Sequence, residues 1–174
     1  IVREHTTVSM KIRSREFVEY LSYSLFSLTG KGASATAITD AKNTLESKAK
    51  FDGELKVVAI RTFKLEDNIY IDLGCENRRV IEVSTNGWKF VDNAPVKFVR
   101  KKGMTVLPTP MGNGEIDLLK KYLNVSEADY PLILGWMFCA LGAVKPYPIL
   151  ILQGEQGTGK SISTRVIRSL IDPS

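Results

Sequence analysis

Apolar residues recur at helical spacing in two stretches near the start of the sequence. The first predicted helix begins after Ser14, which can cap it, and ends at Gly30. The second begins after Ser34 and ends before Asp52 and Gly53. The apolar stripes are Phe17, Leu21, Leu25 and Leu28 in the first helix, and Ile38, Ala41, Leu45 and Ala49 in the second.

Short runs of β-branched and aromatic residues follow, separated by Asp, Asn and Gly at turn positions. Such runs are typical of β-strands, and short links between them favour an antiparallel meander. The predicted strands are residues 55–63, 69–73, 80–84, 88–91 and 96–99.

Helical patterns return in the last third of the sequence. One helix is predicted at 115–123, and another from near Ser126 or Asp129 to Leu141. The second is apolar on most faces, so we expect it to be buried between other elements. The continuous apolar run at 147–152 is typical of a strand buried on both faces of a parallel sheet.

These patterns predict an α+β protein with two domains. Residues 1–103 form a helix-plus-meander domain, the proline- and glycine-rich stretch 104–114 is a linker, and residues 115–174 form the second domain. A winged helix is an alternative for residues 14–73, with the second helix in the DNA major groove and the hairpin as a short wing.

A phosphate-binding motif lies directly after the apolar run. It fits the P-loop pattern of a glycine, four residues and Gly-Lys-Ser. Glycines let the backbone approach phosphate oxygens, and the following helix presents N–H groups and a positive dipole end to an anion. The lysine would reach the β- and γ-phosphates, and the serine hydroxyl would bind Mg²⁺. The predicted ATP-binding residues are Gly154, Glu155, Gln156, Gly157, Thr158, Gly159, Lys160 and Ser161, with Ser161 also holding Mg²⁺ through the nucleotide.

Hydrolysis needs more than this motif. It requires an acidic residue near the metal and a residue that positions water, commonly with an arginine finger. We expect these on elements beyond Ser174, so we assign no catalytic residue within 1–174. The sequence begins at Ile1 without a signal peptide, and we expect it to be an internal piece of a longer protein.

Several stretches together resemble the primase/helicase-like replication ATPases of phages and mobile elements. They include "IYIDLG", "VIEVSTNGWKFVDNAPVKFVRKKGMTVLPTP" and "LILGWMFCALGAVKPYPILILQGEQGTGKS", and the resemblance covers nearly the whole chain. It implies that 115–174 lead into the first strand, P-loop and helix of a truncated α/β P-loop NTPase domain, with Lys160 and Ser161 in the Walker A roles. It also implies a ring-forming homo-oligomer that couples ATP hydrolysis to DNA remodelling or unwinding.

Two other function classes stay open. The chain can be a DNA-binding or adaptor module whose P-loop senses nucleotide without motor activity. A small-molecule kinase uses the same phosphate cradle. The binding module predicts salt-dependent DNA affinity of residues 1–114 alone, and the kinase predicts phosphate transfer to a metabolite without DNA stimulation.

The net charge of +5, with its surplus in the N-terminal part, is compatible with a DNA partner. The candidate contacts are Lys42, Lys48 and Lys50 on the second helix, and Arg100, Lys101 and Lys102 beside Gly103. The alternatives are packing of that helix on the meander and a solvated turn. Trp88 and Phe90 could stack on bases. Because they alternate with Lys89 in a predicted strand, we expect them in the core instead.

The remaining composition points to a cytoplasmic protein outside the membrane. The longest apolar stretch, residues 130–144, is shorter than the roughly 20 residues that a membrane span needs. Cys75 and Cys139 lie far apart and give neither a disulfide framework nor metal-ligand spacing.

Overall fold

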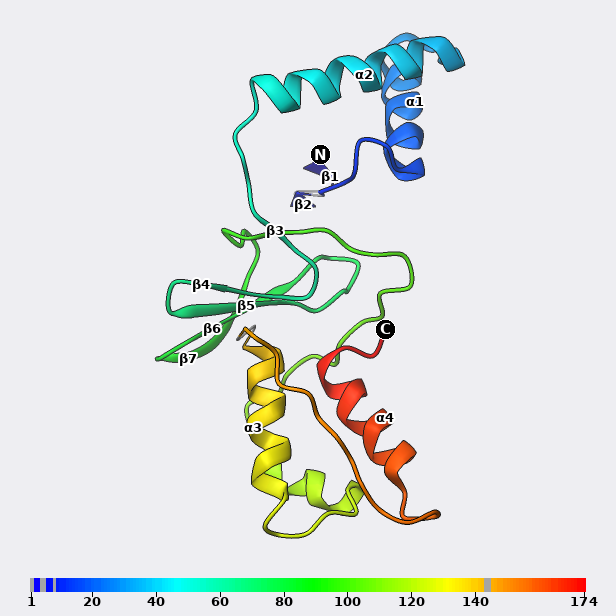
Figure 1. Ribbon diagram of the computed structural model, residues 1–174. Helices are drawn as coiled ribbons and strands as arrows, with labels where there is room; N and C mark the ends of the chain where they lie inside the picture. The colour runs from blue at the N-terminus through cyan, green and yellow to red at the C-terminus, as the bar shows by residue number, and fades with distance from the viewer. Residues whose placement is uncertain (1, 4–5, 8, 143–144) are drawn as a thin grey trace. The chain divides into compact units, whose positions relative to one another are not determined.

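The computed structural model describes residues 2–3, 6–7, 9–142 and 145–174 (Figure 1). The chain folds into two compact units, Ile1–Val57 and Val58–Ser174. The fold is α+β, as the sequence predicts, with helices in both units and an antiparallel sheet in the second. The domain limits at 103 and 115 stay a prediction, as does the winged-helix alternative.

The first unit contains a short ribbon and two helices. Strands β1 (Val2–Arg3) and β2 (Thr6–Thr7) pair antiparallel, and helices α1 (Arg15–Thr29) and α2 (Ala35–Phe51) follow. The predicted caps are present: the Ser14 hydroxyl accepts from the Phe17 N–H at 3.2 Å, and the Ser34 hydroxyl from the Ala37 N–H at 3.1 Å. Gly30 ends α1 with φ of 69°. Local capping therefore fixes both helix starts.

The apolar stripes of these helices are mostly exposed. Phe17 is the buried residue of α1, and none of the α2 residues, all of which the structure describes, is buried. Leu28 is 84% exposed. The first unit therefore gains little stability from a core of its own.

The second unit begins with the predicted meander. Strands β4 (Thr62–Leu65), β5 (Asn68–Asp72), β6 (Val80–Ser84) and β7 (Gly87–Val91) pair antiparallel in the order β4-β5-β6-β7. Two-residue turns join β4 to β5 and β6 to β7. Short hairpins therefore supply each strand with its neighbour.

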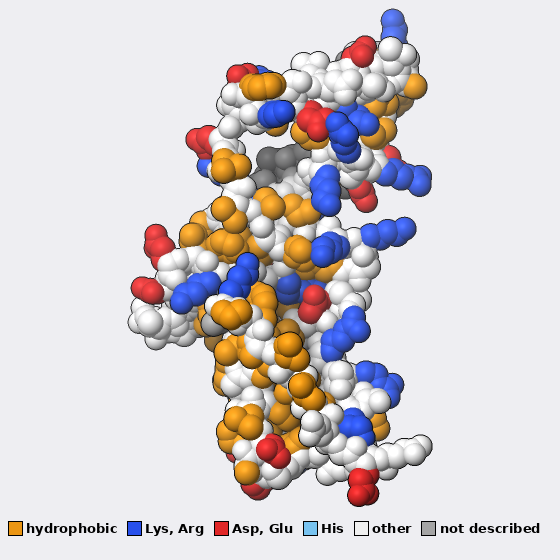
Figure 2. Space-filling view, viewed as in Figure 1, with side chains coloured by type: hydrophobic (Ala, Val, Ile, Leu, Met, Phe, Trp, Pro, Cys, Tyr) orange, Lys and Arg blue, Asp and Glu red, His pale blue; other side chains and the backbone are white. Residues whose placement is uncertain are grey.

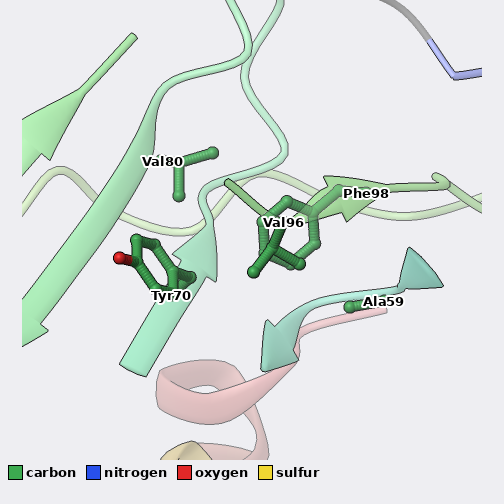
Figure 3. Close-up of a cluster of buried hydrophobic side chains, with 5 residues drawn as sticks. All are labelled: Ala59, Tyr70, Val80, Val96 and Phe98. Carbon is green, nitrogen blue, oxygen red and sulfur yellow. The ribbon is translucent and has the colours of Figure 1, made fainter. Parts of the chain in front are cut away.

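The predictions for the first and last strands were wrong in two respects. The stretch 55–63 bends at residues 60–61 and forms β3 (Val58–Ala59) separately from β4. The last strand, β8 (Lys97–Phe98), pairs in parallel with β3 and does not join the meander. The bend brings Ala59 and Phe98 into one cluster with sheet residues, so burial of apolar surface accounts for the change. The buried members are Ala59, Tyr70, Val80, Val96 and Phe98 (Figure 3).

The helical part of this unit also differs from expectation. The helix predicted at 115–123 is present as η1 (Ile116–Tyr122), and it is of the 3₁₀ type. Helix α3 (Tyr130–Leu141) was expected to be buried between other elements, yet Leu132 is 69% exposed and Phe138 61%. Helix α4 (Lys160–Ile171) follows the glycine-rich motif, as predicted. One face of α3 packs against α4, and the other lies open because no other element among the described residues covers it.

The apolar run at 147–152 forms no strand, although every residue in it is described. Leu150 and Leu152 pack on the cluster around Ile133 and Ile167, whereas Ile149 is 86% and Ile151 70% exposed. The prediction of burial on both faces was therefore wrong. Such burial requires flanking strands, and here helices cover only one face.

No helix within the described ranges has both the length and the apolar character that crossing a bilayer requires.

Candidate functional site

The predicted P-loop lies between the 147–152 run and α4, and three glycines shape it. Gly157 and Gly159 have φ of 87° and 80°, a region that L side chains rarely adopt. Gly154 has φ of 158°, and a Cβ there would lie 2.9 Å from the Thr158 hydroxyl. The loop conformation thus depends on glycine at the positions where the motif has it.

Helix α4 begins at Lys160, directly after the loop. The Ile162 and Ser163 N–H groups both donate to the Gly159 carbonyl, at 2.9 and 3.0 Å. The N–H groups of Lys160 and Ser161 precede this first helical bond, and helix geometry gives them no carbonyl partner within α4. These donors and the positive end of the helix dipole make the junction a suitable place for an anion.

The Lys160 side chain folds back over the loop. Its ammonium donates to the carbonyls of Gly154 at 2.8 Å and Glu155 at 2.5 Å. The Thr158 hydroxyl also donates to the Glu155 carbonyl, at 2.9 Å. The positive charge is therefore held at the mouth of the loop.

The other motif residues lie at the surface. Glu155, Gln156 and Ser161 are exposed, so the Ser161 hydroxyl is accessible at the start of α4. Within the described ranges, no group of three or more His, Cys, Asp or Glu could hold a metal ion by itself. A P-loop Mg²⁺ relies instead on one hydroxyl and on phosphate oxygens.

Two side chains that sequence reasoning missed hold the loop and the run before it. Asn124 donates from Nδ2 to the Thr158 carbonyl at 3.1 Å, and Trp136 donates from Nε1 to the Pro148 carbonyl at 2.7 Å. Both contacts join residues far apart in the sequence, and no local pattern signals them. Asn124, two residues after η1, thus holds the loop, and Trp136 on α3 holds the start of the apolar run.

Two hollows flank the 149–152 run. One, of about 660 Å³, lies between the run, Trp136 and α4, and the other, of about 490 Å³, lies between the run, the 124–129 turn and α3. Leu150, Leu152 and Lys160 line both of them. In Figure 2 hydrophobic side chains gather over this part of the second unit. The hollow beside α4 is mostly apolar, whereas the hollow beside the 124–129 turn also has polar lining such as Asn124 and Asp129, and Lys160 borders both.

The far end of α4 is tied to the sheet. Arg61, 6% exposed, donates to Asp172 Oδ1 at 2.8 Å and to the Thr105 carbonyl at 2.8 Å. Burial alone would raise the pKa of Asp172, but hydrogen bonds from Ser174 and Arg61 hold that pKa below its usual value. An ion pair between Asp172, directly after α4, and Arg61, in the bend before β4, therefore ties the end of this helix to the sheet region.

Arg100 has a structural partner. Its guanidinium donates to both carboxylate oxygens of Asp72, at 2.8 and 2.6 Å, and to the Cys75 carbonyl at 2.6 Å. Asp72 is 2% exposed. Because this ion pair occupies Arg100, the candidate phosphate contacts in this stretch are the exposed Lys101 and Lys102, in the turn at Gly103.

The three α2 lysines do not form one stripe. At 100° per residue, Lys48 and Lys50 are about 160° apart around the helix, and Lys42 is about 80° from Lys50. Lys48 and Lys50 lie in the last turn, where cations favour the helix dipole. The Lys50 ammonium also lies 5.4 Å from the centre of the Phe51 ring. Contact with DNA at α2 stays a prediction.

The expectation that Trp88 and Phe90 are core residues was wrong. They are 43% and 38% exposed on the edge strand β7. Alternation in a strand indicates a shared face, and it does not say whether that face is covered. Both rings are therefore accessible from solvent, which contact with bases would require.

Comparison of the chain with protein-family models, with curated proteins and with solved structures gives no match.

Proposed function

We propose that this chain supplies the phosphate-binding loop of an ATP-dependent replication protein of a mobile genetic element. The parent would couple ATP hydrolysis to the remodelling or unwinding of DNA, as a homo-oligomeric ring. Residues 115–174 would then be the opening of an α/β P-loop NTPase domain, with 147–152 as its first strand. The assignment to mobile elements rests on the sequence resemblance.

One observation carries the nucleotide-binding part of this proposal. The glycine-shaped loop leads directly into α4, and the Lys160 ammonium lies over that loop against the Gly154 and Glu155 carbonyls. Free helix-start N–H groups, a positive dipole end and a lysine thus converge on one spot, which is the requirement for binding a polyphosphate.

The residues present fit a nucleoside triphosphate with Mg²⁺. Lys160 would exchange its carbonyl partners for phosphate oxygens, the N–H groups of Lys160 and Ser161 would donate to them, and the Ser161 hydroxyl would be a magnesium ligand. Bound Mg²⁺ neutralises phosphate charge. We assign none of the described residues to the hydrolytic step.

The exposed side of the 147–152 run supports the NTPase interpretation. Alternate residues of the run pack on α3 and α4, and the others, Ile149 and Ile151, are open to neighbours. A first P-loop strand needs neighbouring strands that are reached through long crossovers, so it cannot obtain them from a local hairpin.

A nucleotide titration tests the proposal. The chain is titrated with a fluorescent ATP analogue, with and without Mg²⁺, and Lys160→Ala is compared with Lys121→Ala. Loss of a charged hydrogen bond costs about 1.5–3 kcal/mol, which is about a 10- to 150-fold weaker affinity for Lys160→Ala. Lys121 is exposed on η1 and lines neither hollow beside the loop, so Lys121→Ala should bind like the wild type. Equal affinity of both variants would contradict the proposal, and so would the lack of any Mg²⁺-dependent binding by the wild type.

The alternative is a DNA-binding or adaptor module in which the P-loop senses nucleotide. It is favoured if the chain binds the analogue and the longer protein that contains it shows no DNA-stimulated hydrolysis. Hydrolysis that increases with DNA favours the motor instead.

A further inference from the structure

One face of the meander presents aromatic rings beside cations. Strand pairing sets Val83 opposite Trp88 and Ile81 opposite Phe90, so both rings of β7 project from the same face as these apolar residues. The rings contact each other edge to face, with centroids 5.6 Å apart. Both are exposed although apolar neighbours lie beside them. They form an aromatic pair on β7, which is an edge strand of the sheet.

Two cations belong to this face. The Arg79 guanidinium lies 5.0 Å from the centre of the Phe90 ring. Lys64 lies on the same face and in the same cross-strand row as Trp88, through Ile69 and Val83, but on the other edge strand, three strand spacings or about 14 Å away. Lys64 and Arg79 are both exposed, and no ion pair with a carboxylate is found for either in the part of the chain that the structure describes.

The opposite face of the same strands differs in charge. Lys89 pairs there with Glu82 at 3.0 Å, and the Tyr70 hydroxyl also donates to Glu82, at 3.0 Å. The hydrogen bond from Lys89, which outweighs the effect of burial, and that from Tyr70 lower the pKa of Glu82. Lys89 is therefore neutralised within the sheet, whereas Arg79, beside the aromatic pair, and Lys64, on the far edge strand of the same face, have no carboxylate partner among the described residues.

We propose that the Trp88–Phe90 face, with Arg79 and Lys64, is a binding surface for single-stranded nucleic acid. Bases stack on exposed aromatic rings without regard to sequence, and arginine and lysine balance the phosphate charge. A duplex keeps its bases stacked on one another, so the rings select unpaired bases. An apolar protein partner would use the rings and leave the two cations without a role. This surface would provide the DNA partner of the proposed function, and it does not require nucleotide at the P-loop.

Anisotropy of a labelled oligothymidylate of about 20 nucleotides tests this surface at low salt. Trp88→Leu keeps an apolar side chain and removes the stacking ring, so its affinity should fall about 5- to 150-fold. Trp88→Phe keeps a ring and should bind within a few-fold of the wild type. Phe138→Leu, at an exposed ring on α3, is the matched control and should bind like the wild type. Thermal melting of each variant shows that it is folded.

Two further measurements separate stacking from general charge attraction. In a Trp136→Phe background, the fluorescence of Trp88 should be quenched by oligothymidylate and little by a duplex. Arg79→Gln should weaken binding and reduce the dependence of log affinity on log salt by about 0.7, the value for one phosphate contact on a single strand.

The outcomes divide clearly. The proposal is overturned if the wild type does not bind oligothymidylate at low salt, or if Trp88→Leu binds as tightly as Trp88→Phe. Lys160→Ala should keep its affinity for the oligonucleotide, and Trp88→Leu its affinity for the ATP analogue. Failure of the stacking surface is therefore distinguishable from failure of the nucleotide site.

Discussion

The β-meander and the 147–152 run are both made of apolar, strand-forming sequence, yet they fold differently. Strands β4 to β7 find their partners through short hairpins, and Tyr70 and Val80 are 4% and 6% exposed. In the run, Leu150 and Leu152 pack inward, whereas Ile149 and Ile151 are mostly exposed. Apolar, strand-forming sequence favours an extended backbone in both regions. Whether that backbone finds a partner strand depends on the link that follows it, because a short hairpin places the next strand alongside and a long crossover does not.

This comparison bears on the site. The P-loop is attached to the less buried region, so its position depends on a few long-range contacts, such as that from Asn124 to the Thr158 carbonyl. The aromatic surface is part of the meander, in which every strand is hydrogen-bonded in register to its neighbour. We therefore expect the two surfaces to respond differently to changes in stability.

The largest expected effect comes from truncating the meander core. Phe98 is 7% exposed and packs between β3 and the sheet, so Phe98→Ala should lower the free energy of unfolding by about 3–5 kcal/mol. Ile151 is 70% exposed, and Ile151→Ala should change it by less than about 0.5 kcal/mol. Urea unfolding followed by circular dichroism measures both. Equal losses would show that the run is as well packed as the meander and would remove the contrast.

A smaller loss is expected from the buried ion pair. Asp72→Ala leaves the Arg100 guanidinium, whose side chain is 17% exposed, without its carboxylate. We expect a loss of about 3 kcal/mol, because the cost of an uncompensated buried charge remains. The measurement is again urea unfolding, with the double variant Asp72→Ala/Arg100→Met as control. Since that variant removes both charges, it should lose less than the sum of the two single variants. Additive losses would mean that the pair is not coupled.

The predictable parts of the fold are those decided locally. Ser14, Ser34 and Gly30 define helix ends through hydrogen bonds within a few residues, and the sequence showed them. Two-residue turns likewise join β4 to β5 and β6 to β7. The pairing of β3 with β8 joins segments almost forty residues apart in the sequence, and no local pattern specifies it. The exposure of Ile149 and Trp88 was missed for a related reason, since a pattern shows which residues are apolar and does not show what covers them.

The candidate site divides in the same way. The motif from Gly154 to Ser161 is continuous in the sequence, and glycine conformations and a helix start follow from it. Asn124 and Trp136, which hold the loop and the run before it, come from other elements and carry no signature. The opposite error occurred at Arg100, which reads as a surface cation beside Lys101 and Lys102 and is instead the partner of Asp72. Charge in a sequence gives no information on whether a buried carboxylate faces it.

The smallest expected effect concerns the link between α4 and the sheet, and it depends on pH. The pKa of Asp172 is lowered in the folded chain, because hydrogen bonds from Ser174 and Arg61 outweigh the effect of burial. A carboxyl with a lowered folded pKa contributes stability above its unfolded pKa of about 3.9, and this contribution is lost as pH falls through the folded value. Its side chain is 43% exposed, so solvent screening should keep the contribution below about 1 kcal/mol.

The test compares urea unfolding of the wild type and of Asp172→Asn from about pH 6 to below pH 4. Asparagine does not titrate there, so the two stabilities should differ at the higher pH and converge as the wild-type carboxyl is protonated. A gap that stays constant over this range would show that ionisation of Asp172 does not stabilise the end of α4. Convergence would show that the helix carrying the P-loop at one end is held electrostatically to the well-packed meander at the other.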